Sequence, residues 1–249
     1  MGRSSLVQVA RDVFVGAGTA VNWVLVREGS DLTLIDGGYP GDVAAVEASI
    51  RELGRDPRDV RAILVTHAHV DHLGAVNPFH ARYGTPVYLH PVEVAHARRE
   101  YLEQLTPREL LPRLWRPRVL PWAVRVLRAG AARDVAAPHA EPFSVGGALD
   151  LPGSPVPVAT PGHTSGHTAY HFPAAGAVAT GDVLITGHAV SRTRGPQLIA
   201  PWFDHGDRGE IRAGLAALED LDAEVVLPGH GPVHHGRVGE AVRRACSAS

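Results

Sequence analysis

The sequence predicts an α/β fold in which helices cover β-sheets from outside. Short β-branched runs recur along the chain, and segments with apolar residues at helical spacing follow several of them. The chain has 249 residues, of which 45% are hydrophobic, and this is enough to bury a sizeable core. We therefore expect one domain over residues 1–249.

Strands and helices are predicted to alternate in the N-terminal part. Residues 21–36 contain two apolar runs around the turn REGSD, a pattern typical of a β-hairpin. Residues 41–53 carry apolar side chains every three or four positions, which predicts a helix with one buried face. The run VRAILVTH at 60–67 is typical of a strand buried on both faces, a helix is expected after it, and another strand is predicted at 85–91.

Residues 91–133 differ in character and are predicted to form a helical, cap-like insert. This segment is rich in arginine and leucine and is interrupted by four prolines. A further helix is predicted over residues 207–221, where Asp207 fits the first position of a capping box. Strand-like runs return after the insert at residues 155–160, 167–172, 176–186 and 224–231.

Composition and charge argue against several functional classes. The formal net charge is −2 and all 24 basic residues are arginine, so a nucleic-acid partner is not expected. The sequence shows neither the apolar core of a signal peptide nor a run of about 18 apolar residues, which favours a cytoplasmic protein. A single cysteine, Cys246, excludes an intramolecular disulfide.

The motif HAHVDH at residues 67–72 places three histidines and an aspartate at the end of a predicted strand. His67 and His69 alternate by two and project to one side if the strand persists, while a turn brings Asp71 and His72 to a second centre. Imidazole nitrogens and carboxylate oxygens suit zinc and related divalent ions. A lone histidine is more often structural, but four such side chains in six residues predict a metal site.

Three more candidate ligands occur in matching contexts. His163, Asp182 and His230 each follow an apolar run and stand beside glycine, which permits the tight turns that aim side chains inward. The seven residues divide into two groups with Asp182 between them. The first group is His67, His69 and His163, and the second is Asp71, His72 and His230.

The motifs HAHVDH, TPGHTSGH, TGD and PGHG, in this order between residues 21 and 233, resemble the motif set of the metallo-β-lactamase-fold hydrolases. The resemblance implies a four-layer αββα sandwich of two mixed β-sheets with outer helices. It also implies two divalent metal ions, with zinc favoured and iron or manganese as alternatives. The run LIDGG resembles the first motif of this family, in which Asp36 supports the site without binding metal.

The chemistry implied by the resemblance is hydrolysis by a metal-bridging hydroxide. Asp71 would bind the second ion, orient the hydroxide and pass its proton toward the leaving group, and it is the predicted catalytic residue. His167 in the same TPGHTSGH motif would hold a ligand in position or serve as a structural histidine.

Differences between this sequence and the family patterns reduce the number of candidate substrate classes. True metallo-β-lactamases lack the bridging aspartate, so Asp182 disfavours a β-lactam substrate. TPGHTSGH is most similar to glyoxalase II, but only 19 residues follow His230, where that enzyme has a glutathione-binding domain. We expect hydrolysis of a small-molecule thioester, ester or lactone. The alternatives are a β-lactam or phosphodiester hydrolase and an iron-dependent redox enzyme of the same fold.

Substrate contacts are predicted from two segments. The insert is expected to roof an apolar pocket, although its aromatic residues could equally be ordinary core beneath a basic face, and it could also form a homodimer interface or, less favoured, a membrane-binding surface. The second segment carries arginines suited to a carboxylate or phosphate. The second segment is residues 191–203, where Arg192 and Arg194 are the expected contacts, and His188 is expected just before it. The expected contacts of the insert are Leu110, Leu111, Leu114, Trp115, Val119 and Trp122.

Overall fold

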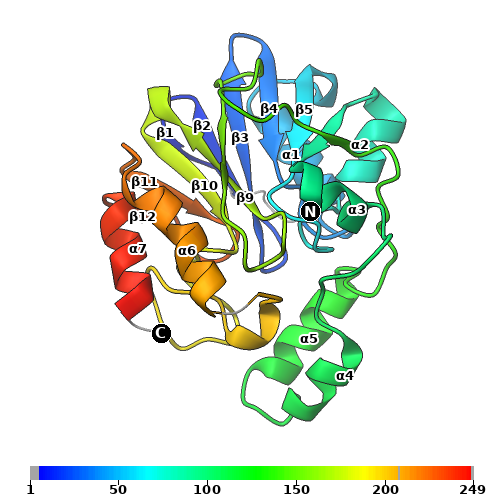
Figure 1. Ribbon diagram of the computed structural model, residues 1–249. Helices are drawn as coiled ribbons and strands as arrows, with labels where there is room; N and C mark the ends of the chain where they lie inside the picture. Colours follow the sequence, from blue (N-terminus) through cyan, green and yellow to red (C-terminus); the bar gives the residue numbers. More distant parts are fainter. Residues whose placement is uncertain (1–5, 207, 248–249) are drawn as a thin grey trace.

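Two β-sheets face each other in the computed structural model, which describes residues 6–206 and 208–247 (Figure 1). The first sheet has seven strands in the order β1 to β7, antiparallel from β1 to β4 and parallel from β4 to β7. Its strands are β1 (Val7–Ala10), β2 (Val13–Ala17), β3 (Asn22–Glu28), β4 (Asp31–Ile35), β5 (Val60–Leu64), β6 (Val87–Leu89) and β7 (Glu141–Pro142).

The second sheet has five strands in the order β12-β11-β10-β9-β8. Within the described residues, β10 and β11 form the one parallel pair of this sheet. The other pairs of neighbouring strands are antiparallel. Both sheets are therefore mixed. The strands are β8 (Val156–Ala159), β9 (Thr168–Phe172), β10 (Ala177–Gly181), β11 (Val225–Pro228) and β12 (His234–His235).

The helices lie outside the two sheets, some of them against an outer face. They are α1 (Val43–Glu52), α2 (Val76–Tyr83), α3 (Val94–Ala97), α4 (Pro107–Leu110), α5 (Val119–Arg128), α6 (Arg208–Glu219) and α7 (Val238–Ser247). Short 3₁₀ turns are η1 (Pro57–Asp59), η2 (Pro91–Glu93), η3 (Leu111–Arg113), η4 (Pro173–Ala175) and η5 (Pro201–Phe203). None of the helices in the described ranges has the length and apolar character needed to cross a membrane.

Strand periodicity decides which side chain enters which layer. In β3, Trp23 and Leu25 point to the side of α1, whereas Val24 and Val26 point toward the second sheet. Side chains of β10 in the second sheet also alternate between two layers. Val178 packs with the helices α6 and α7, and its neighbours Ala177 and Ala179 pack between the sheets. These layers confirm the predicted αββα sandwich.

Residues 91–133, which we call the cap segment, contain only short helices. The segment forms η2, α3, α4, η3 and α5, and a proline stands in the first turn of each of these except α3. In the first turn of a helix, the missing amide hydrogen of proline costs no helical hydrogen bond. Figure 1 shows α4 and α5 standing away from the two sheets. The strand predicted at 176–186 ends at Gly181, where a positive φ of 50° turns the chain. The predicted capping residue Asp207 lies outside the described residues.

One hydroxyl joins the two sheets next to the predicted ligands. Tyr170 of β9 is fully buried, and its hydroxyl donates to the carbonyl of Val65, just after β5, at 2.9 Å. We expect Tyr170→Phe to lower the free energy of unfolding by about 1–3 kcal/mol, because the Val65 carbonyl loses its buried donor. Urea unfolding measures this change. Tyr101→Phe is the matched control, since Tyr101 is 37% exposed, and an equal loss in both variants would contradict the argument.

Candidate metal centre

The HAHVDH loop leaves the end of β5 and is anchored by Asp36, which follows β4. Asp36 has a positive φ of 61°, and its Oδ1 accepts from the amide of Thr66 at 2.8 Å. The second carboxylate oxygen accepts from Nδ1 of His72 at 2.8 Å. Asp36 therefore directs Nε2 of His72 away from itself and toward the other ligand candidates, which is a supporting position.

Three imidazoles and a carboxylate meet in the first group. Nδ1 of His69 lies 3.0 Å from Nε2 of His67 and 3.2 Å from Nε2 of His163. Oδ2 of Asp182 lies 3.5 Å from Nε2 of His163 and 3.8 Å from Nε2 of His67. One ligand atom from each residue falls within 4.8 Å of the others, so a single ion can touch all four.

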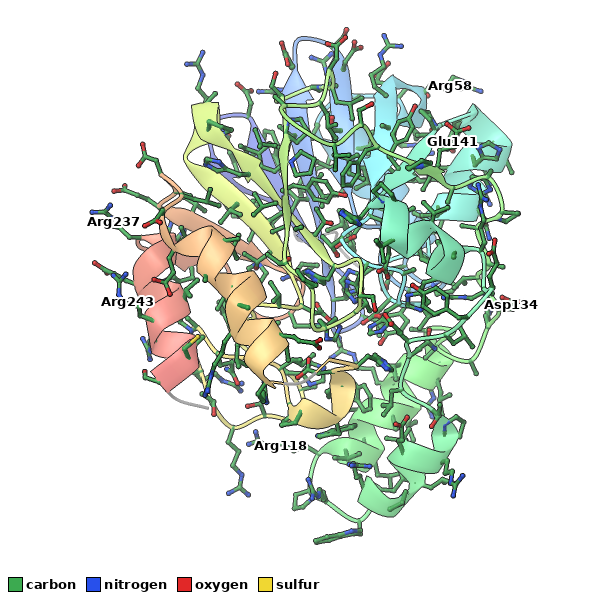
Figure 2. The ribbon with its side chains drawn as sticks, viewed as in Figure 1. Arg58, Arg118, Asp134, Glu141, Arg237 and Arg243 are labelled. Carbon is green, nitrogen blue, oxygen red and sulfur yellow. The ribbon has the colours of Figure 1, made fainter. Side chains whose placement is uncertain are left out.

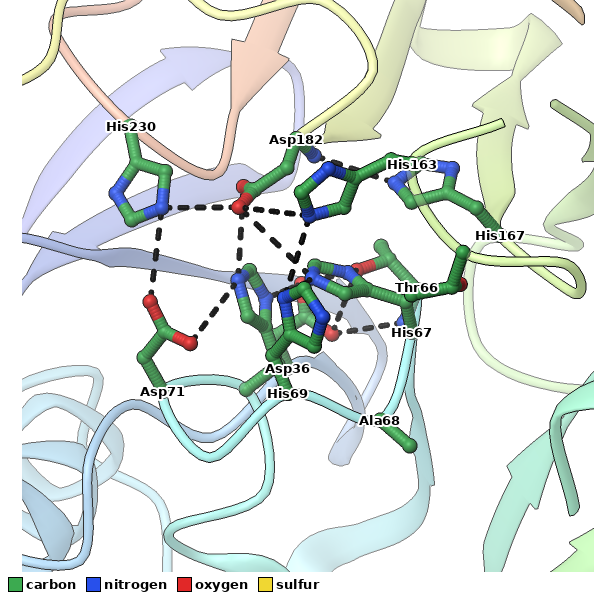
Figure 3. A network of polar contacts seen from close by, with 12 residues as sticks. Asp36, Thr66, His67, Ala68, His69, Asp71, His163, His167, Asp182 and His230 are labelled. Atoms are coloured by element: carbon green, nitrogen blue, oxygen red, sulfur yellow. Dashed lines mark hydrogen bonds and ion pairs between the residues drawn. The ribbon is translucent and has the colours of Figure 1, made fainter. Parts of the chain in front are cut away.

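The second group contains Asp71, His72 and His230. Nε2 of His230 lies 3.6 Å from Oδ2 of Asp71, and Nε2 of His72 lies 4.0 Å from Oδ1 of Asp71. Asp182 reaches this group as well, at 3.0 Å from His230 and, through its other oxygen, 3.5 Å from His72. Figure 3 shows Asp182 between the two groups, where the sequence places it.

Every one of the five imidazoles is held through its far ring nitrogen. The partners are the hydroxyl of Thr66 for His67 (3.0 Å), the carbonyl of Glu103 for His69 (2.5 Å), Asp36 for His72 (2.8 Å), Asp204 for His163 (3.1 Å) and the carbonyl of Ala20 for His230 (2.6 Å). A carbonyl or carboxylate can only accept, so the far nitrogens of the other four rings carry the proton, and the Thr66 hydroxyl, which donates to Asp36, can accept from His67. In a neutral ring the lone pair then lies on the near nitrogen, as a metal ligand requires.

Orphaned atoms at the centre show that the residues fit a divalent ion. Nε2 of His72 and Oδ1 of Asp182 are buried without a hydrogen-bond partner, which is rare unless an ion or water completes the site. Three near nitrogens of the first group converge at 3.0–3.2 Å around His69. The nitrogen and oxygen donor set suits zinc, iron or manganese.

Charge at the centre also favours a cation. Burial opposes protonation of His72, yet the carboxylates of Asp36, Asp182 and Asp71 outweigh it and raise the pKa of His72 well above its ordinary value. Burial and the neighbouring imidazoles lower the pKa of His67 and His69 well below the ordinary value. His67 and His69 are thus neutral, and His72 attracts positive charge, which a proton or a metal ion can supply.

Glu93 joins the two histidine loops, and the sequence reasoning missed it. Its fully buried carboxylate accepts from the amide of Ala68 at 2.8 Å through Oε1, and from the Thr164 hydroxyl and the Gly166 amide at 2.9 Å through Oε2. Oε1 also accepts from Nδ1 of His96 at 2.7 Å. The detectable signal is a Glu-x-x-His spacing directly after the strand predicted at 85–91.

Two further residues beside the centre were not predicted. The backbone carbonyl of Glu103 accepts from His69, and its carboxylate accepts from the amide and hydroxyl of Ser165 at 2.7 and 2.5 Å. Tyr39 is buried near the carboxylates of Asp71 and Asp182. Burial and the charges of Asp71 and Asp182 raise the pKa of Tyr39 well above its ordinary value, so its hydroxyl stays protonated.

His167 and His188 lie beside the ligands without joining them. Nε2 of His167 accepts from the amide of Asp182 at 3.2 Å, and its Nδ1 contacts the hydroxyl of Thr160 at 2.8 Å, so this ring positions the Asp182 backbone. The His188 ring lies 4.9 Å from that of His230. Burial is the main cause that lowers the pKa of each to about 3.

A cavity of about 720 Å³ opens on the metal ligands and is roofed by the cap segment. His69, Asp71, His163, Asp182 and His230 form its floor. Its other walls are mainly apolar and are contributed by Leu105, Leu110, Leu111, Leu114, Leu120 and Trp122. We call it the apolar cavity, and its size and lining are typical of a small-molecule site.

Four predicted contacts lie outside this cavity. Trp115 and Val119 line a second cavity, together with the residues between them. Arg192 is exposed and lines the second cavity. Arg194 is exposed and lines neither cavity.

Residues 16–230 match the sequence profile of the Metallo-beta-lactamase superfamily, which covers both ligand groups. The chain belongs to the metallo-beta-lactamase superfamily. One curated relative is the "Probable metallo-hydrolase YflN" of Bacillus subtilis, which is 26% identical to this chain. The match covers 83% of this chain and 78% of the relative. The "Probable metallo-hydrolase YqgX" of the same organism is 30% identical over 77% of each chain.

Solved structures of the superfamily share the fold. A metallo-beta-lactamase family protein from Thermus thermophilus has a TM-score of 0.62 and 26% identity, covering 92% of this chain and 74% of that chain. A metallo-beta-lactamase from Cronobacter sakazakii has a TM-score of 0.69 over 98% of this chain and 92% of that one, but only 18% identity, and so indicates the fold alone. The superfamily match and the metallo-hydrolase relatives therefore indicate that this chain is a metal-dependent hydrolase with a His/Asp metal site.

Removal of the Glu93 charge tests its role in joining the loops. In Glu93→Gln the amide NH₂ faces two of the donors that the carboxylate accepts from, so the histidine loops lose their common anchor. We expect the affinity for zinc, measured by competition with a chelator, to fall about 10- to 100-fold. Glu100→Gln, at an exposed position seven residues on, serves as the control. Unchanged zinc affinity in Glu93→Gln would rule out the positioning role.

The neutral state of His167 predicts a pH dependence of the metal-free protein. Folded His167 has a pKa of about 3 and unfolded histidine one of 6.5, so unfolding takes up a proton below pH 6.5 and stability falls with the pH. When the pH falls from about 7.5 to about 5.5, the free energy of unfolding should decrease in both proteins. The decrease should be about 1.4 kcal/mol smaller in His167→Gln than in the parent. Denaturant titrations at both pH values measure this. The exposed His235→Gln should track the parent, and identical losses in all three proteins would contradict a neutral His167.

Proposed function

We propose that this protein hydrolyses a small-molecule thioester, ester or lactone with two divalent ions, zinc being favoured. The observation that carries the proposal is the apolar cavity, whose floor consists of the ligand residues and whose roof is a row of leucines. An apolar acyl group bound against the leucines would bring its carbonyl carbon to the floor. Such a substrate is small enough for a cavity of about 720 Å³.

The position of Asp182 supports two ions. Its Oδ2 lies near His163 of the first group and His230 of the second group. Its Oδ1 lies near His72, which also belongs to the second group. The first ion would be held by His67, His69, His163 and Asp182, and the second by Asp71, His72, His230 and Asp182. Divalent ions bound there supply a Lewis acid for the carbonyl and lower the pKa of a water toward neutrality.

Asp71 and Tyr39 supply the proton chemistry of the chain itself. Asp71 lines the apolar cavity, and its carboxylate can accept a proton from the attacking water and release it to the leaving atom. Tyr39 lines the same cavity near Asp71 and stays protonated, so it offers a donor to a developing negative charge.

The test is a substrate panel assayed with the zinc-reconstituted protein: an acyl thioester, a lactone, a simple ester, a chromogenic β-lactam and a phosphodiester. We expect turnover of the thioester, ester or lactone, and a fall in kcat/KM of about 100-fold or more in Asp71→Asn. Elemental analysis should find two zinc ions per chain. Asp150→Asn, at an exposed position, is the matched control.

Other outcomes replace the proposal. Turnover of only the β-lactam or the phosphodiester would assign a different bond. Iron in the purified protein, with oxygen consumption and no hydrolysis, would assign redox chemistry. A single zinc ion per active chain would overturn the two-ion site, and full activity in Asp71→Asn would remove this residue from the proton path.

A further inference from the structure

A second cavity of about 540 Å³ adjoins the first and is strongly basic. Four arginines line it, Arg116, Arg118, Arg192 and Arg208, and none of its described lining residues is acidic. This is unusual for a chain of net charge −2. It lies between the start of α5 and the segment that precedes α6, and Figure 2 shows Arg118 at this edge of the molecule. We call it the basic cavity.

Two of the four arginines hold the walls of the basic cavity together. Arg118 donates to the carbonyl of Ser191 at 2.9 Å, which ties the cap segment to the segment before α6. Arg208 donates to the carbonyl of Ile199 at 3.1 Å and lies 3.4 Å from the carboxylate of Asp204. These contacts give both guanidinium groups a structural role.

The other two arginines are free to bind a ligand. Arg116 and Arg192 are exposed, and within residues 6–206 and 208–247 their side chains have no hydrogen bond or ion pair. Trp115 stands beside them at the rim and is 79% exposed. Unpaired guanidinium groups next to an exposed tryptophan form a recognition surface for an anion attached to a larger group.

The two cavities share two lining residues beside the candidate metal centre. His188 and Ile199 line both of them, and the ring of His188 lies 4.9 Å from that of His230. A molecule that spans both cavities therefore passes beside His230, which shares its ligand group with Asp71. This is the group from which the proposed function delivers a proton to the leaving atom.

We propose that the basic cavity binds a phosphate or carboxylate on the leaving group of the substrate, while the apolar cavity holds the acyl part. This inference rests on the proposed function. For a thioester, water adds to the acyl carbon, the C–S bond breaks, the acid remains in the apolar cavity and the thiol leaves with the proton. Guanidinium groups suit either anion because both offer two oxygens to the paired N–H donors.

The first experiment compares three octanoyl thioesters with the zinc-loaded protein. Coenzyme A supplies phosphates, glutathione supplies carboxylates, and N-acetylcysteamine is a neutral thiol. We expect kcat/KM for at least one anionic thioester to exceed that for the neutral one by about tenfold or more. The double variant Arg116→Gln/Arg192→Gln should lose this advantage and keep its activity on the neutral thioester. Arg194→Gln, which lies outside both cavities, should match the parent.

Direct binding separates the two proposals. S-methyl-coenzyme A and S-methylglutathione carry the same anions with a capped sulfur, and calorimetry measures their binding without turnover. We expect at least one to bind, and binding to weaken about tenfold or more in the double variant. The stronger of the two ligands distinguishes phosphate from carboxylate.

The outcomes are distinguishable. Arginine-dependent binding without hydrolysis of any thioester would overturn the proposed function and keep the anion site. Hydrolysis of all three thioesters at equal rates, unchanged in the double variant, would keep the hydrolase and overturn the anion site. Binding of both capped thiols that the double variant leaves unchanged would likewise overturn it.

Discussion

The buried carboxylate of Asp182 imposes the constraint on which the rest of the structure depends. A charge removed from water is costly unless other groups compensate it, and Asp182 lies within 4 Å of four imidazole rings. Those rings in turn need fixed orientations, which five acceptors around the site provide. The αββα sandwich is the frame that brings these loops to one edge.

Most of the fold and the candidate ligands could be predicted from the sequence because each strand, helix and ligand motif is a local pattern, and the family resemblance implies how the motifs come together. The period of two in β3 separates Trp23 from Val24, and that alternation is visible in the letters. The four ligands of HAHVDH are neighbours in the chain, and glycine marks the turns at the other three. Predictions of this kind need no knowledge of which segments meet.

Glu93 and the basic cavity could not be predicted in the same way. Glu93 binds backbone amides of Ala68 and Gly166, and any residue type except proline supplies an amide hydrogen, so its partners leave no pattern in the sequence. The basic cavity exists because Arg116 comes to lie near Arg192, across more than seventy positions of the chain. The cap segment was predicted as helical, but its division into short pieces depends on how each proline-bounded fragment packs.

The contacts of the cap segment with the ligand loops also have a thermodynamic consequence. Glu93 and Glu103 belong to the segment that roofs the apolar cavity, and both hold residues of the metal centre. Because the Glu103 carbonyl holds His69, binding of an apolar molecule against this roof and binding of metal at His69 would be linked equilibria. Linkage is reciprocal, so the factor by which bound metal tightens the binding of an apolar molecule equals the factor by which that molecule tightens the binding of metal. The roof then also serves to retain the metal.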